Sequence, residues 1–246
     1  MTRILLLGGT SEASRLAGLL AGAGMNAIFS YAGRTDAPRA QPLPMRVGGF
    51  GGVAGLSDYL RQQEISHVID ATHPFAARIS RNAMLACERA GVDLLVLQRR
   101  AWRAGDGDNW TMVADYDSAA AALPDGGARV FLAIGKQNLQ PFASRANRYL
   151  LRLVDAPQGP LPLPNAEAVI ARGPFTPEDD FDLLTRHRVT HLVAKNSGGS
   201  GAEAKLIAAR RLGLPVVMID RPALPSRRIV HRPEDALDWL HHSTSA

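Results

Sequence analysis

Short apolar runs alternate with helical patterns along the first hundred residues of this 246-residue chain. Five runs have the length and composition of buried strands, at residues 4–7, 26–31, 45–47, 67–71 and 93–97. Apolar residues recur on one helical face from Ala13 to Leu20, and further helices are predicted at 53–63 and 75–90. Strand–helix–strand units join parallel strands through right-handed crossovers. The pattern therefore predicts a doubly wound, parallel α/β sheet.

The second half of the chain repeats this alternation after an interruption. Residues 99–117 break the rhythm, and a short helix follows in the segment SAAAALPDGGA. Strand-like runs then resume, at 129–135, 148–154, 167–172, 191–195 and 215–219. A last helix at 233–242 is expected to pack back on a sheet face. We therefore predict two successive α/β domains, 1–124 and 125–246, linked near residues 124–128.

The stretch LLLGGTSEASRLA, residues 5–17, joins a strand to a helix through two glycines. At such a junction the unpaired N–H groups of the helix start attract an anion, and Gly8 and Gly9 let it approach the backbone. The stretch lacks the spacing G-x-G-x-x-G, because Ser11 and Glu12 follow Thr10. Two interpretations stay open: a cradle for a nucleotide pyrophosphate, or a glycine turn with Thr10 as an ordinary N-cap.

The segment SYAGR, residues 30–34, ends the second predicted strand. In dinucleotide-binding sheets this position meets the adenosine ribose, where an acid selects NAD and an arginine accommodates the 2′-phosphate of NADP. Ser30 offers a hydroxyl and Arg34 a charged fork, which favours NADPH. Asp36 is the opposing feature, but it lies beyond the arginine.

Two further segments follow strand ends, where open α/β sheets bind ligands. DATHPFA, residues 70–76, places Thr72 and His73 in a turn and Pro74 at the expected start of a helix. A structural histidine is the alternative there. AKNSGGSGAEAK, residues 194–205, is a glycine loop flanked by two of the chain's three lysines. It is predicted to bind anions through its N–H groups, the alternative being a flexible connection.

Composition excludes several classes of function. The net charge is +5, of which residues 123–246 carry +4, so an anionic partner is expected. The basic residues are scattered rather than clustered, which favours a polyanionic small molecule over nucleic acid. No apolar stretch is long enough to span a membrane, and the single cysteine cannot form an internal disulfide. No signal region is expected, because Met1-Thr2-Arg3 leads straight into a predicted strand. A cytoplasmic enzyme without a metal site is expected, since no ligand cluster appears.

The ordered set of motifs resembles the precorrin-6A reductase family of cobalamin biosynthesis. The motifs span nearly the whole chain: GGTSE at 8–12, SYAGR at 30–34, GGFGG at 48–52, DATHPF at 70–75, IGKQNL at 134–139, AKNSGG at 194–199 and IDRP at 219–222. The resemblance implies two Rossmann-like domains with an active site in the cleft between them. It also implies an NADPH-dependent oxidoreductase that reduces one C=C bond of precorrin-6A, a tetrapyrrole carrying several carboxylates, to precorrin-6B.

The resemblance implies roles for particular residues. The cofactor is expected at Gly9, Thr10, Ser11, Glu12, Ser30, Arg34, Thr72 and Pro74. The substrate carboxylates, or the far edge of the cofactor, are expected at Lys136, Lys195, Ser197, Gly198 and Lys205. His73 is the candidate proton donor, with bulk water as its rival. A monomer is expected. The alternatives are a cobalt-precorrin-6A reductase of the anaerobic route and a non-enzymatic module that binds nucleotides or anionic ligands.

Overall fold

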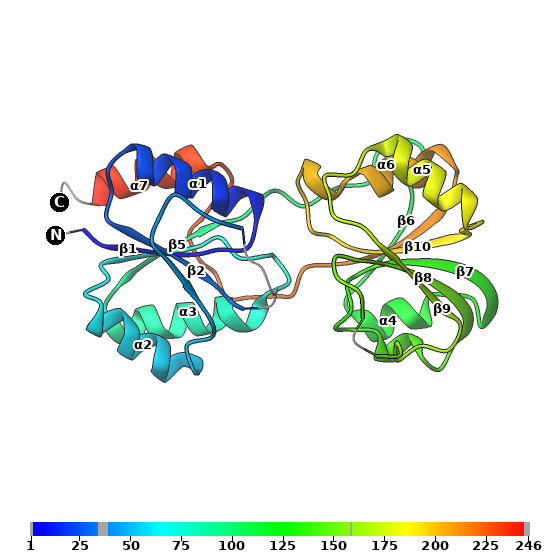
Figure 1. Cartoon of the computed structure of the whole chain (residues 1–246), viewed down its shortest axis with the longest axis horizontal. Coiled ribbons are helices and arrows are strands. Elements are labelled where there is room, and N and C mark those ends of the chain that lie inside the picture. Colours follow the sequence, from blue (N-terminus) through cyan, green and yellow to red (C-terminus); the bar gives the residue numbers. More distant parts are fainter. Residues whose placement is uncertain (1, 34–38, 158, 244–246) are drawn as a thin grey trace. The chain divides into compact units, whose positions relative to one another are not determined.

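The computed structural model describes residues 2–33, 39–157 and 159–243 and divides the chain into two compact units. The first unit comprises Met1–Arg100 together with Ala223–Ala246, and the second comprises Ala101–Pro222. Each unit contains one six-stranded sheet with helices on both faces (Figure 1). The expected α/β fold with two parallel sheets is confirmed.

The sheet of the first unit is parallel throughout its described pairs. Its strands are β1 (Ile4–Leu7), β2 (Ala27–Tyr31), β3 (Met45–Val47), β4 (His67–Asp70), β5 (Asp93–Leu97) and β12 (Ile229–Val230). They lie in the order β12-β5-β4-β1-β2-β3. β2 and β3 are thus on one side of β1, and β4, β5 and β12 are on the other. The point where the order reverses is between β1 and β4, and ligands bind at such points in open α/β sheets.

Alternating side chains of β1 build two separate cores. Ile4 and Leu6 face α1 (Ser11–Gly22) and α7 (Pro233–Ser243), whereas Leu5 and Leu7 face α2 (Gly52–Gln62) and α3 (Ala77–Ala90). The two helix pairs cover opposite faces of the sheet (Figure 1). Because both faces are covered, β1 is buried along its whole length, which explains its uninterrupted apolar sequence.

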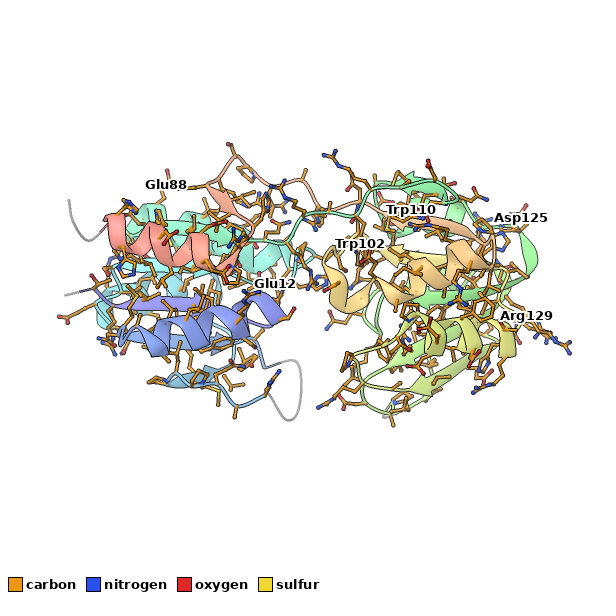
Figure 2. The ribbon with its side chains drawn as sticks, turned by 90° about the horizontal axis from the view of Figure 1, so that it is seen from above. Glu12, Glu88, Trp102, Trp110, Asp125 and Arg129 are labelled. Carbon is orange, nitrogen blue, oxygen red and sulfur yellow. The ribbon has the colours of Figure 1, made fainter. Side chains whose placement is uncertain are left out.

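The second unit has a sheet of the same kind. Its strands are β6 (Asn109–Val113), β7 (Gly126–Ala133), β8 (Ala146–Leu153), β9 (Ala166–Ile170), β10 (His191–Lys195) and β11 (Pro215–Ile219), in the order β6-β11-β10-β7-β8-β9. α5 (Pro177–Arg186) and α6 (Ala204–Arg211) cover one face, and α4 (Tyr116–Ala121) covers the other (Figure 1). Trp102 and Trp110 pack against the core beneath α5 and α6 (Figure 2). The order reverses between β7 and β10.

The expected domain boundary at residue 124 is wrong, because it falls inside the second unit between α4 and β7. β6 precedes that boundary but pairs with β11, as in the register of Trp110 with Val216. β12 and α7, at the other end of the chain, belong to the first unit, where β12 pairs with β5. Both strands are edge strands with exposed residues, Met112 and Ile229 among them, and neither shows the apolar run of a buried strand.

Most other elements agree with the prediction. The strands expected at 4–7, 45–47, 93–97, 191–195 and 215–219 have those bounds, and the last helix packs against the first sheet through Ala236, Leu237 and Leu240. Helix α3 begins at Ala77 instead of residue 75, so Pro74 lies in the turn before the helix. In the part of the chain that the structure describes, no helix is long and apolar enough to cross a membrane.

Acid is expected to destabilise the protein through two histidines. Burial lowers the pKa of His67, with a smaller opposing effect of Asp93, and burial also lowers the pKa of His191. The unfolded chain binds their protons near pH ~6.5, so the stability that they contribute is complete above that pH and is lost as the pH falls toward the folded-state pKa values. We expect the free energy of unfolding to fall by roughly 0.5–1.5 kcal/mol between pH 7.5 and 5.5.

Urea denaturation at the two pH values measures this loss. The double variant His67→Gln/His191→Gln is expected to show a smaller difference between them, and the exposed His242→Gln is the control. An undiminished pH dependence in the double variant would contradict the assignment.

Candidate functional site

The turn after β1 depends on two glycines for different reasons. Gly8 is buried, and a Cβ at this position would collide with the ring of Phe29. Gly9 is exposed and has φ +127°, a conformation that side chains rarely adopt, and a Cβ there would meet no atom within 4 Å. Packing therefore requires Gly8, whereas Gly9 leaves the backbone bare beside the start of α1. This is the arrangement that a pyrophosphate needs.

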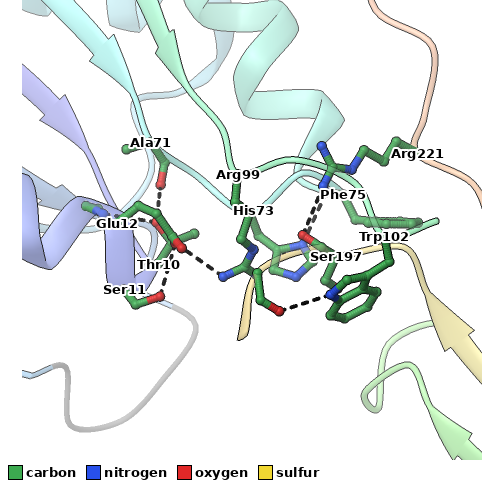
Figure 3. A network of polar contacts seen from close by, with 12 residues as sticks. Thr10, Ser11, Glu12, Ala71, His73, Phe75, Arg99, Trp102, Ser197 and Arg221 are labelled. Carbon is green, nitrogen blue, oxygen red and sulfur yellow. Dashed lines mark hydrogen bonds and ion pairs between the residues drawn. The ribbon is translucent and has the colours of Figure 1, made fainter. Parts of the chain in front are cut away.

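Thr10 connects this turn to the end of β4. It is the N-cap of α1, and its Oγ1 accepts a hydrogen bond from the Ala13 N–H at 3.1 Å. The same hydroxyl donates to the carbonyl of Ala71 at 2.8 Å (Figure 3). The N-cap interpretation is thus confirmed. It leaves the anion-binding interpretation open, because Ala13 is the residue whose main-chain N–H the Thr10 hydroxyl accepts.

The first turn of α1 carries a compensated negative charge. Glu12 Oε2 accepts from Ser11 Oγ at 3.1 Å and from Arg99 Nη1 at 3.2 Å (Figure 3). The side chains of Glu12 and Arg99 are 20% and 15% exposed, so the pair is largely withdrawn from water. Arg99 therefore offsets a carboxylate that would otherwise repel an anion at the helix start.

The loop after β4 orients two polar side chains. Asp70 is buried, and its Oδ1 accepts from the Thr72 N–H at 3.1 Å and from the Thr72 hydroxyl at 2.7 Å. The Nδ1 atom of His73 accepts from the Phe75 N–H at 3.2 Å. That hydrogen bond requires an unprotonated Nδ1, so the neutral imidazole carries its proton on Nε2.

The predicted ribose contacts are only partly described. Arg34 and Asp36 lie outside the described residues. Ser30 is buried near the end of β2, and its Oγ accepts from Arg46 Nη1 at 2.8 Å. Arg46 lies opposite Ser30 on β3, a contact that sequence spacing does not show.

The second unit holds the loop after β10 in place from both sides. The side-chain amide of Asn196 accepts from the N–H of Trp102 at 2.8 Å and donates to its carbonyl at 3.1 Å. Arg221 donates through Nε to the Asn196 carbonyl at 2.9 Å and through Nη2 to the Ser197 carbonyl at 3.1 Å (Figure 3). The indole N–H of Trp102 donates to the Gly199 carbonyl at 3.0 Å. These hydrogen bonds tie the loop to Trp102 and Arg221, which favours an anchored loop over a flexible connection.

The predicted substrate residues occupy different environments. Lys136 is exposed in the loop after β7, and Lys195 is the last residue of β10. Ser197 is buried, and Gly198 has φ +70°. Lys205 is only 5% exposed; its ammonium donates to the Ala202 carbonyl and lies 5.1 Å from the centre of the Trp102 ring. The burial of Lys205 favours a role in holding the loop over direct contact with a ligand.

Sequence reasoning missed four residues that organise these loops: Arg46, Arg99, Trp102 and Arg221. Arg99 and Arg221 each follow a strand by two residues, so their placement at a carboxyl edge was a usable signal. The partners of Arg46 and Trp102 depend on tertiary contacts. Within the described ranges, no group of three potential ligands could hold a metal ion.

The glycine turn makes a specific prediction about stability. We expect Gly8→Ala to lower the free energy of unfolding by about 2–4 kcal/mol, because Phe29 lies within the core and cannot yield without disturbing it. Gly9→Ala is expected to cost only about 1 kcal/mol, through backbone strain alone. Chemical denaturation of both variants measures the difference, and equal losses would contradict the two separate roles.

Comparison with known proteins adds to this geometry. The model of the family described as precorrin-6x reductase CbiJ/CobK matches residues 3–241. A precorrin-6A reductase of Rhodobacter capsulatus is 64% identical over 241 residues, which cover 98% of this chain and 96% of that protein. A cobalt-precorrin-6A reductase of Priestia megaterium is 30% identical, with 98% and 99% coverage.

A solved structure agrees over the same extent. The structure of a CobK precorrin-6A reductase superposes with a TM-score of 0.94 at 62% identity, covering 98% of this chain and 97% of that one. Agreement in sequence and fold thus extends through both units, including the edge strands that sequence patterns missed. The chain belongs to the precorrin-6x reductase family.

Proposed function

We propose that this enzyme uses NADPH to reduce one C=C bond of precorrin-6A, giving precorrin-6B in the aerobic cobalamin pathway. The observation that carries the proposal is the 64% identity with a precorrin-6A reductase along nearly the whole of both chains. The matched region includes the carboxyl ends of the strands in both sheets. The proposal therefore rests on the sequence of the candidate sites as well as on the fold.

The first unit supports a dinucleotide. Its strand order reverses beside the Gly8–Gly9 turn, where Gly9 leaves open space next to the start of α1. We assign the pyrophosphate to Gly9, Thr10 and Ser11, with main-chain N–H groups as donors because the Thr10 hydroxyl already serves Ala13 and Ala71. Glu12 contributes as a neutralised pair with Arg99. Ser30 and Arg34 are assigned to the adenosine 2′-phosphate.

The loop after β4 is assigned to the nicotinamide side. Bound NADPH supplies a hydride, so the protein's task is to orient its ligands and provide a proton. Asp70 fixes Thr72, and Pro74 constrains the turn that contains His73. Because His73 Nδ1 accepts from Phe75, the neutral ring carries its N–H on Nε2. Proton donation by the cationic ring requires loss of that bond, and water is the alternative donor.

The second unit supports a polycarboxylate ligand. Lys136 follows β7 and Lys195 ends β10, and the sheet order reverses between these two strands. We assign substrate carboxylates to these two lysines and to the segment of Ser197 and Gly198. Arg221 donates to the carbonyls of Asn196 and Ser197, and the Lys205 ammonium donates to the Ala202 carbonyl, so both position the loop. A tetrapyrrole with several carboxylates matches this concentration of positive charge.

The choice between the two substrate types rests on similarity. The relative that acts on precorrin-6A is 64% identical, and the one named for cobalt-precorrin-6A is 30% identical. Nothing in the described residues resembles a cluster of metal ligands, but a cobalt ion enclosed by the macrocycle requires none. The cobalt-free substrate is therefore proposed on the identity values, and the protein is proposed to act as a monomer.

Turnover tests the proposed reaction. Purified enzyme with NADPH and precorrin-6A is expected to consume NADPH in equal amount to the substrate, with a slower reaction on cobalt-precorrin-6A. Absorbance of the reduced nicotinamide and mass spectrometry of the product, two hydrogens heavier, measure this. Reaction with the cobalt form alone would favour the anaerobic route. Binding of both ligands without NADPH consumption would favour a non-enzymatic module.

Nucleotide titration tests the proposed cofactor. We expect wild-type protein to bind NADPH more tightly than NADH, and Arg34→Ala to weaken NADPH binding by roughly 1.5–3 kcal/mol, as for loss of a charged hydrogen bond. Fluorescence of the reduced nicotinamide measures both affinities. The solvent-exposed Arg89→Ala, at the end of α3, is the control. An unchanged preference in Arg34→Ala would contradict the assignment of Arg34.

A further inference from the structure

Arg46 is a half-buried cation at the edge of the first sheet where β2 and β3 end. Its Nη1 donates to Ser30 Oγ at 2.8 Å and to the Gly48 carbonyl at 2.9 Å, and its Nη2 donates to the Gly49 carbonyl at 3.2 Å. The guanidinium therefore joins a strand residue to the glycine loop 48–52 that leads into α2. Its position is fixed from several sides.

The contacts of Arg46 leave its charge uncompensated within the described residues. All three hydrogen-bond acceptors are neutral oxygens, and the other contacts are rings: the guanidinium carbon lies 3.8 Å from the centre of Phe50 and 5.2 Å from that of Tyr59. No described carboxylate forms an ion pair with it, whereas Arg99 and Arg152, whose side chains are largely buried, pair with Glu12 and Asp180. Burial lowers the pKa of Arg46, with a smaller opposing effect of Tyr59.

The loop that borders this charge is rich in glycines with open space around them. A Cβ built at Gly48, Gly49, Gly51 or Gly52 would meet no atom within 4 Å, so open space borders the loop that Arg46 supports. The guanidinium has five N–H groups, and three are used in the bonds above. Ser30, at 2.8 Å from Nη1, stands near the end of β2, the place at which a dinucleotide-binding sheet meets the adenosine ribose.

We propose that Arg46 is a specificity-determining residue that favours a nucleotide with a phosphate on its adenosine ribose. Its fixed, uncompensated charge beside Ser30 attracts the phosphate monoester and does little for a ribose that carries only hydroxyl groups. The inference rests on the proposed function, since it concerns the nucleotide assigned to the first unit. It adds a second cation, on β3, to the one proposed at Arg34.

Paired titrations test the role of Arg46. Wild type, Arg46→Met and Arg46→Lys are titrated with NADPH and NADH, and with the fragments 2′,5′-ADP and 5′-AMP, which lack the nicotinamide. For Arg46→Met we expect about 10- to 100-fold weaker binding of NADPH and 2′,5′-ADP, as for loss of a charged contact, and less than about threefold change for NADH and 5′-AMP. Arg46→Lys should retain part of the preference. Arg61→Met, exposed on α2, is the control.

Each outcome decides the inference. Equal weakening of phosphorylated and unphosphorylated nucleotides in Arg46→Met would mean that Arg46 only holds the glycine loop, and unchanged affinities would also overturn the proposal. If Arg46→Met does not fold, as judged by its circular dichroism and melting, Arg46→Lys decides by the same ratio. If the wild type binds neither dinucleotide, the proposed function itself fails. If the wild type binds NADPH and NADH equally, only the selectivity assigned to Arg46 is lost.

Discussion

Parallel pairing of β1 with β2 on one side and β4 on the other is the constraint on which the first unit depends. In this register Leu7 lies opposite both Ser30 and Asp70, so three strand ends reach the same edge together. The helices that follow β1 and β4 pack on opposite faces of the sheet. The loops after these two strands therefore diverge and expose their main-chain groups. The Thr10–Ala71 hydrogen bond then holds the two loops at a fixed spacing.

The second unit also holds a loop at the point where its strand order reverses, but it uses different contacts. β7 and β10 pair in parallel at the reversal of strand order, and the loop after β10 has no N-cap threonine comparable to Thr10. Instead, the Asn196 side chain pairs with the backbone of Trp102, and Arg221 bonds the carbonyls that follow β10. These contacts satisfy buried polar groups, whose orphaning would cost about 1–3 kcal/mol each. A glycine-rich segment is thereby ordered ahead of the short 3-10 helix Ser200–Ala202 and of α6.

Some residues of the candidate sites could be recognised from the sequence alone, and others could not. Gly8, Gly9 and Thr10 were recognisable because a turn between a strand and a helix is a local feature, governed by neighbouring residues. Arg46 was not, because its partner Ser30 is sixteen residues away and the register of β2 with β3 joins them. Lys205 was expected to bind a substrate carboxylate beside a glycine loop, whereas the fold buries it against Trp102. Long-range contacts decide such cases, and spacing along the chain does not reveal them.

The sequence by itself determined the alternation of strands and helices, the two parallel sheets and the resemblance to a reductase family. These follow from local periodicity and from motifs with close internal spacing. Only the tertiary structure decided which edge strand belongs to which sheet, placing β6 beside β11 and β12 beside β5. The physical reason is that a short edge strand buries little apolar surface, so its own residues do not select a partner. The backbone hydrogen bonds offered by a finished sheet edge select it instead.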